Sequence, residues 1–147
     1  MSKMPRVQAV VLPLLRDALP PEITVSSWVA DIDYRTFPIL NVRRVGGKRH
    51  LRRPTQLGLP VIEMSVYGTV GLPETEQIYE DALEALFEAV RLQTQTPAGY
   101  LHSMKETMGM TQFSSLFMDS WRVQGLIQLG VRPRKVTLNQ ENIHVTE

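Results

Sequence analysis

Apolar positions in two parts of the chain recur at helical spacing. The first run covers residues 5–18 and the second covers residues 73–93, and each predicts an amphipathic helix with one face in the core. A proline pair at residues 20–21 ends the first run. Pro13 lies inside that run, so we expect it to kink the helix or to confine its regular part.

Five further segments predict strands, the first of them because β-branched residues alternate along it. They cover residues 23–29, 37–45, 61–67, 100–108 and 121–131. Gly46 and Gly47 are expected to end the second strand, and residues 48–59 to form a long polar hairpin tip. Residues 109–118 are apolar without a clear period, which predicts an irregular stretch.

This order of elements, helix, three strands, helix and two strands, predicts an α+β fold. We expect a mostly antiparallel sheet of about five strands, with two helices packed on one face. In the last strand, apolar residues such as Ile127 alternate with polar ones such as Gln128. One face of the sheet is therefore expected to pack in the core, and the opposite face meets water or a partner. No repeat or linker is visible, and we assign residues 1–133 to a single domain and residues 134–147 to a polar tail.

Composition removes several classes of chemistry. The 147 residues include no cysteine, which excludes disulfides, thiolate metal sites and thiol catalysis. The net charge is only +1, so overall electrostatics do not require nucleic acid or a membrane as partner. The apolar stretch at residues 10–15 is too short to cross a bilayer, and we expect a soluble, cytosolic protein without a membrane partner.

Charge is divided between two neighbouring segments. A basic segment, residues 43–53, contains no acid and carries Arg43, Arg44, Lys48, Arg49, Arg52 and Arg53. The second predicted helix is acidic, and Glu80, Glu84 and Glu88 form an acidic strip along it at intervals of four residues. Opposite charges at separate places on one surface suit head-to-tail association of copies, which closes into rings.

The basic segment and the apolar residues of the stretch 109–118 each allow more than one interpretation. The basic segment could be a solvated loop, a surface that docks on an acidic partner, or a nucleic-acid-binding site, although it contains no Phe, Tyr or Trp for base stacking. Met110, Phe113 and Phe117 could cover the core or form an adaptable contact surface.

No group of residues predicts catalysis or metal binding. Asp31 and Asp33 would share a strand face, but no third carboxylate is near them in the sequence. His50, His102 and His144 are scattered and stand at no metal-ligand spacing. We therefore expect no enzyme activity, no cofactor and no metal site, and the alternative is a small hydrolase or metal enzyme that uses Asp31, Asp33 and His102.

The chain as a whole resembles the tail terminator, or tail completion, proteins of bacteriophages with long, non-contractile tails. The resemblance covers residues 5–133. It lies in the order of elements and in residues 11–20, 37–47 and 61–67, the acidic helix, and the closing strand that ends Val131-Arg132-Pro133.

The resemblance implies a structural virion protein without catalytic residues. Such a protein is assembled in the host cytoplasm and forms a homohexameric ring in the neck region, at the head-proximal end of the tail tube. It stops tube polymerisation, and its partners are other copies of itself, the tail tube protein and a head–tail connector or head-closure protein. DNA passes through its channel without sequence-specific binding.

Within such a ring, the basic segment and the acidic strip could be the two halves of the contact between subunits, with Met110, Phe113 and Phe117 supplying apolar area. The hairpin could equally reach the tube. Two further functions are alternatives: another neck or head-closure component, and a nucleic-acid-binding module that uses residues 43–53.

Overall fold

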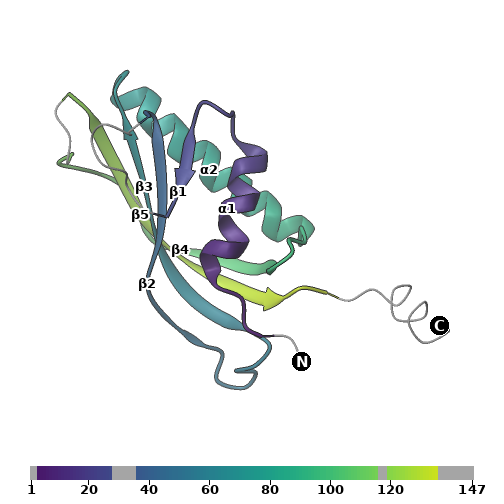
Figure 1. Ribbon diagram of the computed structural model, residues 1–147. Coiled ribbons are helices and arrows are strands. Elements are labelled where there is room, and N and C mark those ends of the chain that lie inside the picture. The colour runs from purple at the N-terminus through teal and green to yellow at the C-terminus, as the bar shows by residue number, and fades with distance from the viewer. Residues whose placement is uncertain (1–2, 28–35, 116–118, 136–147) are drawn as a thin grey trace.

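The computed structural model describes residues 3–27, 36–115 and 119–135. Its elements, in chain order, are α1 (Val7–Ala18), β1 (Thr24–Ser26), β2 (Ile39–Arg49), β3 (Gly58–Gly68), α2 (Leu72–Leu92), β4 (Gly99–Phe113) and β5 (Trp121–Pro133). This order confirms the predicted α+β class and its arrangement of two helices and five strands (Figure 1).

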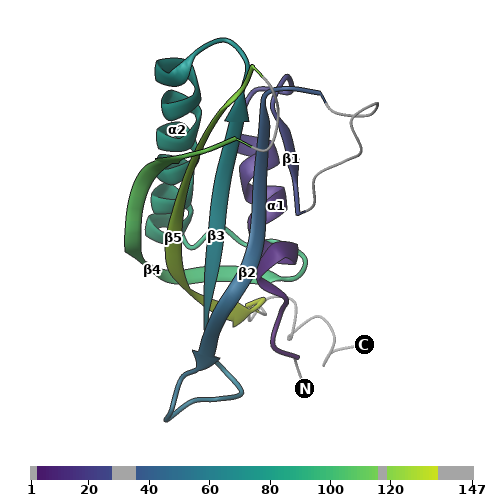
Figure 2. The same cartoon turned by 90° about the vertical axis from the view of Figure 1, so that its left-hand side faces the viewer.

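The strands form one sheet in the order β1-β2-β3-β5-β4. The short β1 pairs parallel to β2, and the other pairs are antiparallel. Seen face-on, the sheet has both helices behind it, so one face is covered and the opposite face, called the open face below, is not (Figure 2). The open face, the outer sides of the two helices and the hairpin turn are therefore the surfaces available for contacts with other molecules.

Apolar side chains at helical spacing hold the two helices on the sheet. In α1, which continues through Pro13, Val7, Val11 and Leu15 are buried. α2 buries a stripe that includes Tyr79, Ala82, Leu83, Leu86 and Ala89. They meet the covered face of the sheet, where the buried side chains include Leu40, Val42, Ile62, Met64, Val66, Leu101, Val123, Ile127, Leu129 and Val131.

The prediction that Gly46 and Gly47 end the second strand is wrong. β2 has a β-bulge between Arg44 and Gly46 and then continues its pairing with β3 as far as Arg49. Gly47 has a φ of +101°, which glycine adopts without the steric cost that a side chain would bring. A bulge bends and twists a strand without ending it, so the hairpin is longer and its turn is confined to residues 50–57.

The predicted irregular stretch at residues 109–118 is also corrected in part. β4 continues to Phe113, because Thr111 and Phe113 still pair with Gln124 and Arg122 of β5 across three register shifts. Such shifts disrupt the period of two, which explains why the sequence pattern of a strand was lost here. Phe117, Asp31, Asp33 and His144 lie outside the described residues, and the predicted domain bounds stay a prediction.

Candidate functional site

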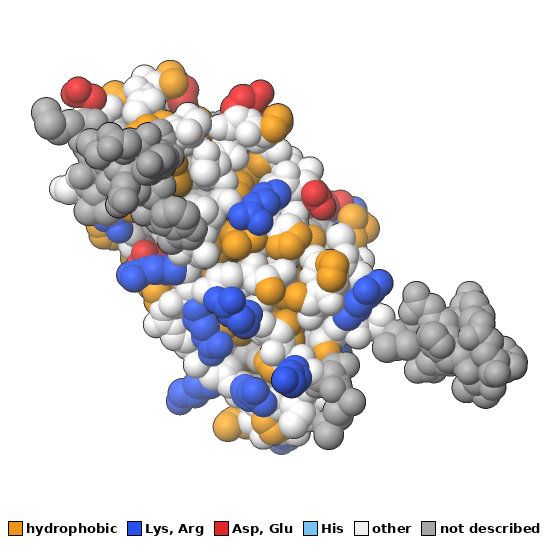
Figure 3. All heavy atoms as spheres, viewed as in Figure 1, with side chains coloured by type: hydrophobic (Ala, Val, Ile, Leu, Met, Phe, Trp, Pro, Cys, Tyr) orange, Lys and Arg blue, Asp and Glu red, His pale blue; other side chains and the backbone are white. Residues whose placement is uncertain are grey.

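The basic segment and the acidic strip lie on different parts of the molecule. Arg43, Arg44, Lys48 and Arg49 are on β2, whereas Arg52 and Arg53 are in the hairpin turn. In Figure 3, most Lys and Arg side chains gather over the lower half, and most Asp and Glu side chains lie toward the upper border. The charge division seen in the sequence is thus also a division in space.

Several of the arginines have partners within their own chain. Arg43 Nε lies 3.1 Å from Glu63 Oε1, and this hydrogen-bonded ion pair raises the pKa of Arg43. Arg44 Nε donates to the carbonyl oxygen of Gly46 at 3.0 Å, beside the bulge. The charge of Arg43 is therefore matched locally, and Arg44 supports the bulge, which leaves the end of the hairpin as the main excess of positive charge.

Side-chain and main-chain hydrogen bonds organise the hairpin turn. His50 Nδ1 accepts from the backbone N–H groups of Arg52 and Arg53, each at 3.2 Å. The His50 N–H donates to the Leu57 carbonyl oxygen at 2.9 Å, which closes the turn. A histidine here acts as a side-chain cap of the kind that Asp or Asn often provides. The turn then presents Leu51, whose side chain is 94% exposed.

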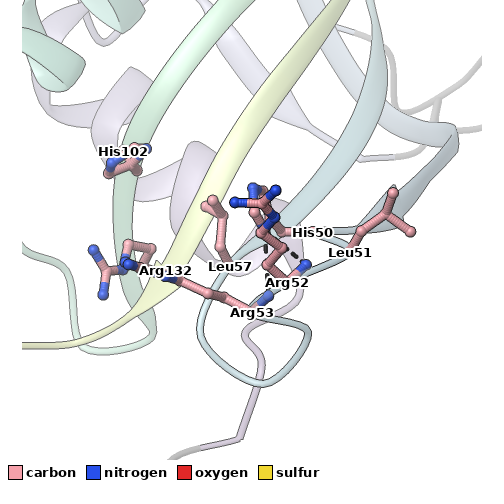
Figure 4. Close-up of a pocket in the computed structure, with 7 residues that line it drawn as sticks. All are labelled: His50, Leu51, Arg52, Arg53, Leu57, His102 and Arg132. Carbon is pink, nitrogen blue, oxygen red and sulfur yellow. Dashed lines mark hydrogen bonds between the residues drawn. The ribbon is translucent and has the colours of Figure 1, made fainter.

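A hollow of about 530 Å³ lies beside the turn, between it and the ends of β4 and β5. It is lined by His50, Leu51, Arg52, Arg53, Leu57, His102 and Arg132 (Figure 4). In this view Leu51 points away from His102 and Arg132. The lining includes three arginines and no carboxylate, so the hollow is suited to negatively charged groups.

Sequence reasoning did not place His102 or Arg132 at this site. They follow the turn by some fifty and eighty positions, respectively, and only the pairing of β3 with β5 and of β5 with β4 brings them beside it. The alternation in β5 puts Arg132 on the open face. That pattern predicts the side of the sheet on which Arg132 lies, but it does not predict that Arg132 lies beside the hairpin turn. His50 and His102, which are distant in the sequence, line the same hollow.

The acidic strip is exposed on α2, but its three members differ. Arg91 binds Glu88, with Nε 2.9 Å from Oε2, and this bond lowers the pKa of Glu88. Among the described residues, no ion pair is found for Glu80 or Glu84. Phe87 lies between the ends of the strip and is 47% exposed. Within the acidic strip, Glu80 and Glu84 are therefore the members whose charge is left to attract a cation.

The apolar candidates of β4 have different environments. Met110 is partly buried against the core. Phe113 is 37% exposed on the open face, where the Arg122 guanidinium lies 5.5 Å from its ring centroid and 5.7 Å from that of Tyr67. Arg122 between two rings forms a cation–π arrangement that organises this end of the open face.

The described part of the chain contains no cluster of three or more His, Cys, Asp or Glu residues with metal-binding geometry. Within the same residues, no helix has the length and apolar character needed to cross a membrane.

Comparison with known proteins gives a consistent assignment. Residues 3–138 match the family described as phage tail termination protein. The gene 22 protein of Mycobacterium phage L5 is 58% identical over 139 residues, which cover 94% of this chain and 100% of that protein. The gene 22 protein of Mycobacterium phage D29 is 59% identical over 139 residues, which cover 93% of this chain and 100% of that protein. This chain belongs to the phage tail termination protein family, and it is accordingly a structural component of a phage tail.

Proposed function

We propose that this protein forms a homohexameric ring at the head-proximal end of the phage tail tube, in the neck region. The ring ends polymerisation of the tube protein and provides the surface on which the head connector or head-closure protein docks. Assembly takes place in the host cytoplasm, and DNA later passes through the ring without sequence-specific recognition.

The family match across residues 3–138 is the observation that carries this proposal. It favours tail termination over the alternative of another neck component, because the match is to the termination family and spans nearly the whole chain. The separation of basic and acidic surfaces agrees with head-to-tail contacts, which repeat around a closed ring and leave no unmatched patch.

A gene-inactivation experiment tests the role directly. A phage that encodes this chain is given a stop codon early in its gene, and tails are measured by electron microscopy with and without the protein supplied in trans. We expect tubes of uncontrolled length that do not join heads, and we expect tails of normal length when the protein is supplied. Tails of normal length without the protein would refute termination.

A second measurement separates termination from head closure. Purified protein is added to polymerising tube subunits in the absence of heads. If the protein is a terminator, elongation stops and one end of each tube carries the added protein. Continued elongation, with binding only to heads, would assign the protein to head closure instead.

A further inference from the structure

We infer that the hairpin turn of one copy, through Leu51, Arg52 and Arg53, docks on the outer face of α2 of a second copy, around Phe87, Glu80 and Glu84. The inference rests on the proposed ring and names the contact that builds it. The occupant of both surfaces is thus another copy of this chain.

The turn has the properties of a preorganised docking element. Leu51 is 94% exposed, and burial of such a side chain in a contact removes apolar area from water. Arg52 and Arg53 follow it directly, with their backbone N–H groups held by His50 Nδ1. Because these bonds already organise the turn, docking has less chain entropy to overcome.

The outer face of α2 supplies a matching target. Phe87 is 47% exposed, and Glu84 and Glu80 precede it by three and seven positions, which places all three on one side of a helix. Neither carboxylate has an ion pair among the described residues. An apolar centre with two adjacent negative charges is complementary to a leucine followed by two arginines.

The arrangement of the two surfaces requires the contact to be between copies. The turn extends from the sheet at the end opposite the start of α2, and the basic and acidic side chains gather on different parts of the surface (Figures 1 and 3). One copy therefore presents its turn to one neighbour and its α2 face to another, as a heterologous ring contact demands.

Within this contact, charge and apolar area have separate effects. In the proposed contact the carboxylates meet Arg52 and Arg53, which line the hollow beside the turn. Exposed charge pairs mainly steer and orient association. Contact of Leu51 with Phe87 provides the apolar centre that such interfaces need for affinity.

The first experiment reverses charge on each surface and then on both. The turn variant is R52E/R53E, the helix variant is E80R/E84R, and the four changes are also combined in one chain. The control is D17R/E22R, which makes the same charge change as the helix variant at exposed positions beyond either surface. Self-association is measured by sedimentation velocity across a concentration series, and circular dichroism confirms that each variant is folded.

We expect each reversal alone to weaken self-association on the order of a hundredfold, because like charges then face each other. The combined chain should recover association, since opposite charges meet again, and the control should associate like the unchanged protein. Association of both reversed variants at the unchanged strength would overturn the inference. A combined chain that fails to recover, or an unchanged protein that stays monomeric at every concentration, would also overturn it.

A second experiment tests the head-to-tail geometry. The turn is truncated as L51A/R52A/R53A, and the α2 face is truncated separately as E80A/E84A/F87A. Each variant alone should be monomeric, and their equimolar mixture should stop at a 1:1 dimer, because one intact turn and one intact α2 face remain per pair. A mixture that stays monomeric contradicts the contact. The turn variant is also tested for binding to a 30-base-pair DNA duplex. If it binds this duplex less tightly than the unchanged protein does but still self-associates, the turn is a nucleic-acid surface and the inference fails.

These outcomes are separable from the proposed function. If the variants still form rings and still set tail length, the contact is wrong while termination stands. If the unchanged protein associates through these surfaces but does not affect tail length in the gene-inactivation experiment, the contact stands and termination fails.

Discussion

At the scale of single residues, a close contact in the core joins α2 to β5. The Tyr79 ring is completely buried, and its hydroxyl lies over Gly125. Its Oη has no hydrogen-bond partner among the described residues, which is costly for a buried hydroxyl. Glycine at position 125 is required by this ring, since a Cβ would overlap Tyr79 and would come within 2.9 Å of the Met108 carbonyl oxygen.

Replacing Gly125 should therefore destabilise the protein through overpacking. We expect G125A to lower the free energy of unfolding by about 1–3 kcal/mol, as measured by urea denaturation. Adding Y79F to G125A should recover part of that loss, because the overlapping oxygen is removed. Equal stability of G125A and the unchanged protein would contradict the described packing.

The same tyrosine makes a specific contribution to alkaline stability. Burial raises the pKa of Tyr79 far above its ordinary value, and the nearby Glu106 and Glu80 add to the shift. The unfolded chain loses this proton near pH 10 while the folded chain retains it, so the free energy of unfolding falls as the pH rises above about 10. Below that pH both states are protonated and Tyr79 adds no pH dependence.

Y79F should remove this part of the alkaline loss. At pH 7 we expect the variant to lie within about 1 kcal/mol of the unchanged protein, because the hydroxyl that it removes has no partner. Urea denaturation at pH 7, 9 and 11 provides the comparison. An equally steep decline of both proteins above pH 10 would show that the Tyr79 hydroxyl is not kept protonated by the fold.

At the scale of elements, the β2–β3 hairpin determines where the basic side chains lie. Its bulge lets β2 pass Gly46 and Gly47 and continue to Arg49. The two glycines have different surroundings. A Cβ on Gly47 would come within 2.5 Å of Pro60 Cα and 2.7 Å of the Val61 nitrogen, whereas one on Gly46 would meet nothing within 4 Å.

The pair of glycines provides a matched test of the bulge. We expect G47A to lower the free energy of unfolding by roughly 2 kcal/mol or more, because a side chain is strained at this φ and collides with backbone. G46A should change it by less than about 0.5 kcal/mol, as is usual for open surface positions. Thermal and urea denaturation of both variants give the comparison, and equal effects would contradict the described bulge.

At the scale of the whole molecule, a nearly neutral chain is strongly polarised. A net charge of +1 conceals a basic hairpin end and an acidic α2. Ion pairs within the chain reduce the net charge of both surfaces, because Glu63 binds Arg43 and Arg91 binds Glu88. Arg52 and Arg53 at the hairpin turn, and Glu80 and Glu84 on α2, have no ion pair among the described residues, and we expect association of copies to depend on their charge.

Salt should therefore weaken the self-association of this protein. Between 50 and 500 mM NaCl the screening length falls from roughly 14 Å to 4 Å, so attraction between exposed opposite charges is mostly lost. We expect a rise of about tenfold in the dissociation constant measured by sedimentation. Thermal stability of the isolated chain should change little over the same range. Association that is unaffected by salt, or strengthened by it, would indicate a contact made mainly by apolar area.

Particular residues show how far sequence reasoning reached. The helical spacing of apolar residues in α1 and α2, and the alternation in β5, follow from the geometry of each element alone and were predicted correctly. The continuation of β2 through two glycines and of β4 to Phe113 was not predicted. In both strands a bulge shifts the period, and only pairing with the neighbouring strand shows that the strand persists.

The candidate site, too, was predicted in part from the sequence and decided in part by the tertiary structure. The amino-acid sequence by itself determined the class of fold, the order of elements and the presence of opposite charges in neighbouring segments, because these depend on local period and composition. Only the tertiary structure decided which arginines are already paired, that Leu51 projects from the turn, and that His102 and Arg132 lie beside it. The place of His102 and Arg132 depends on the pairing of β3 with β5 and of β5 with β4, and such long-range pairing leaves no local signal in the sequence.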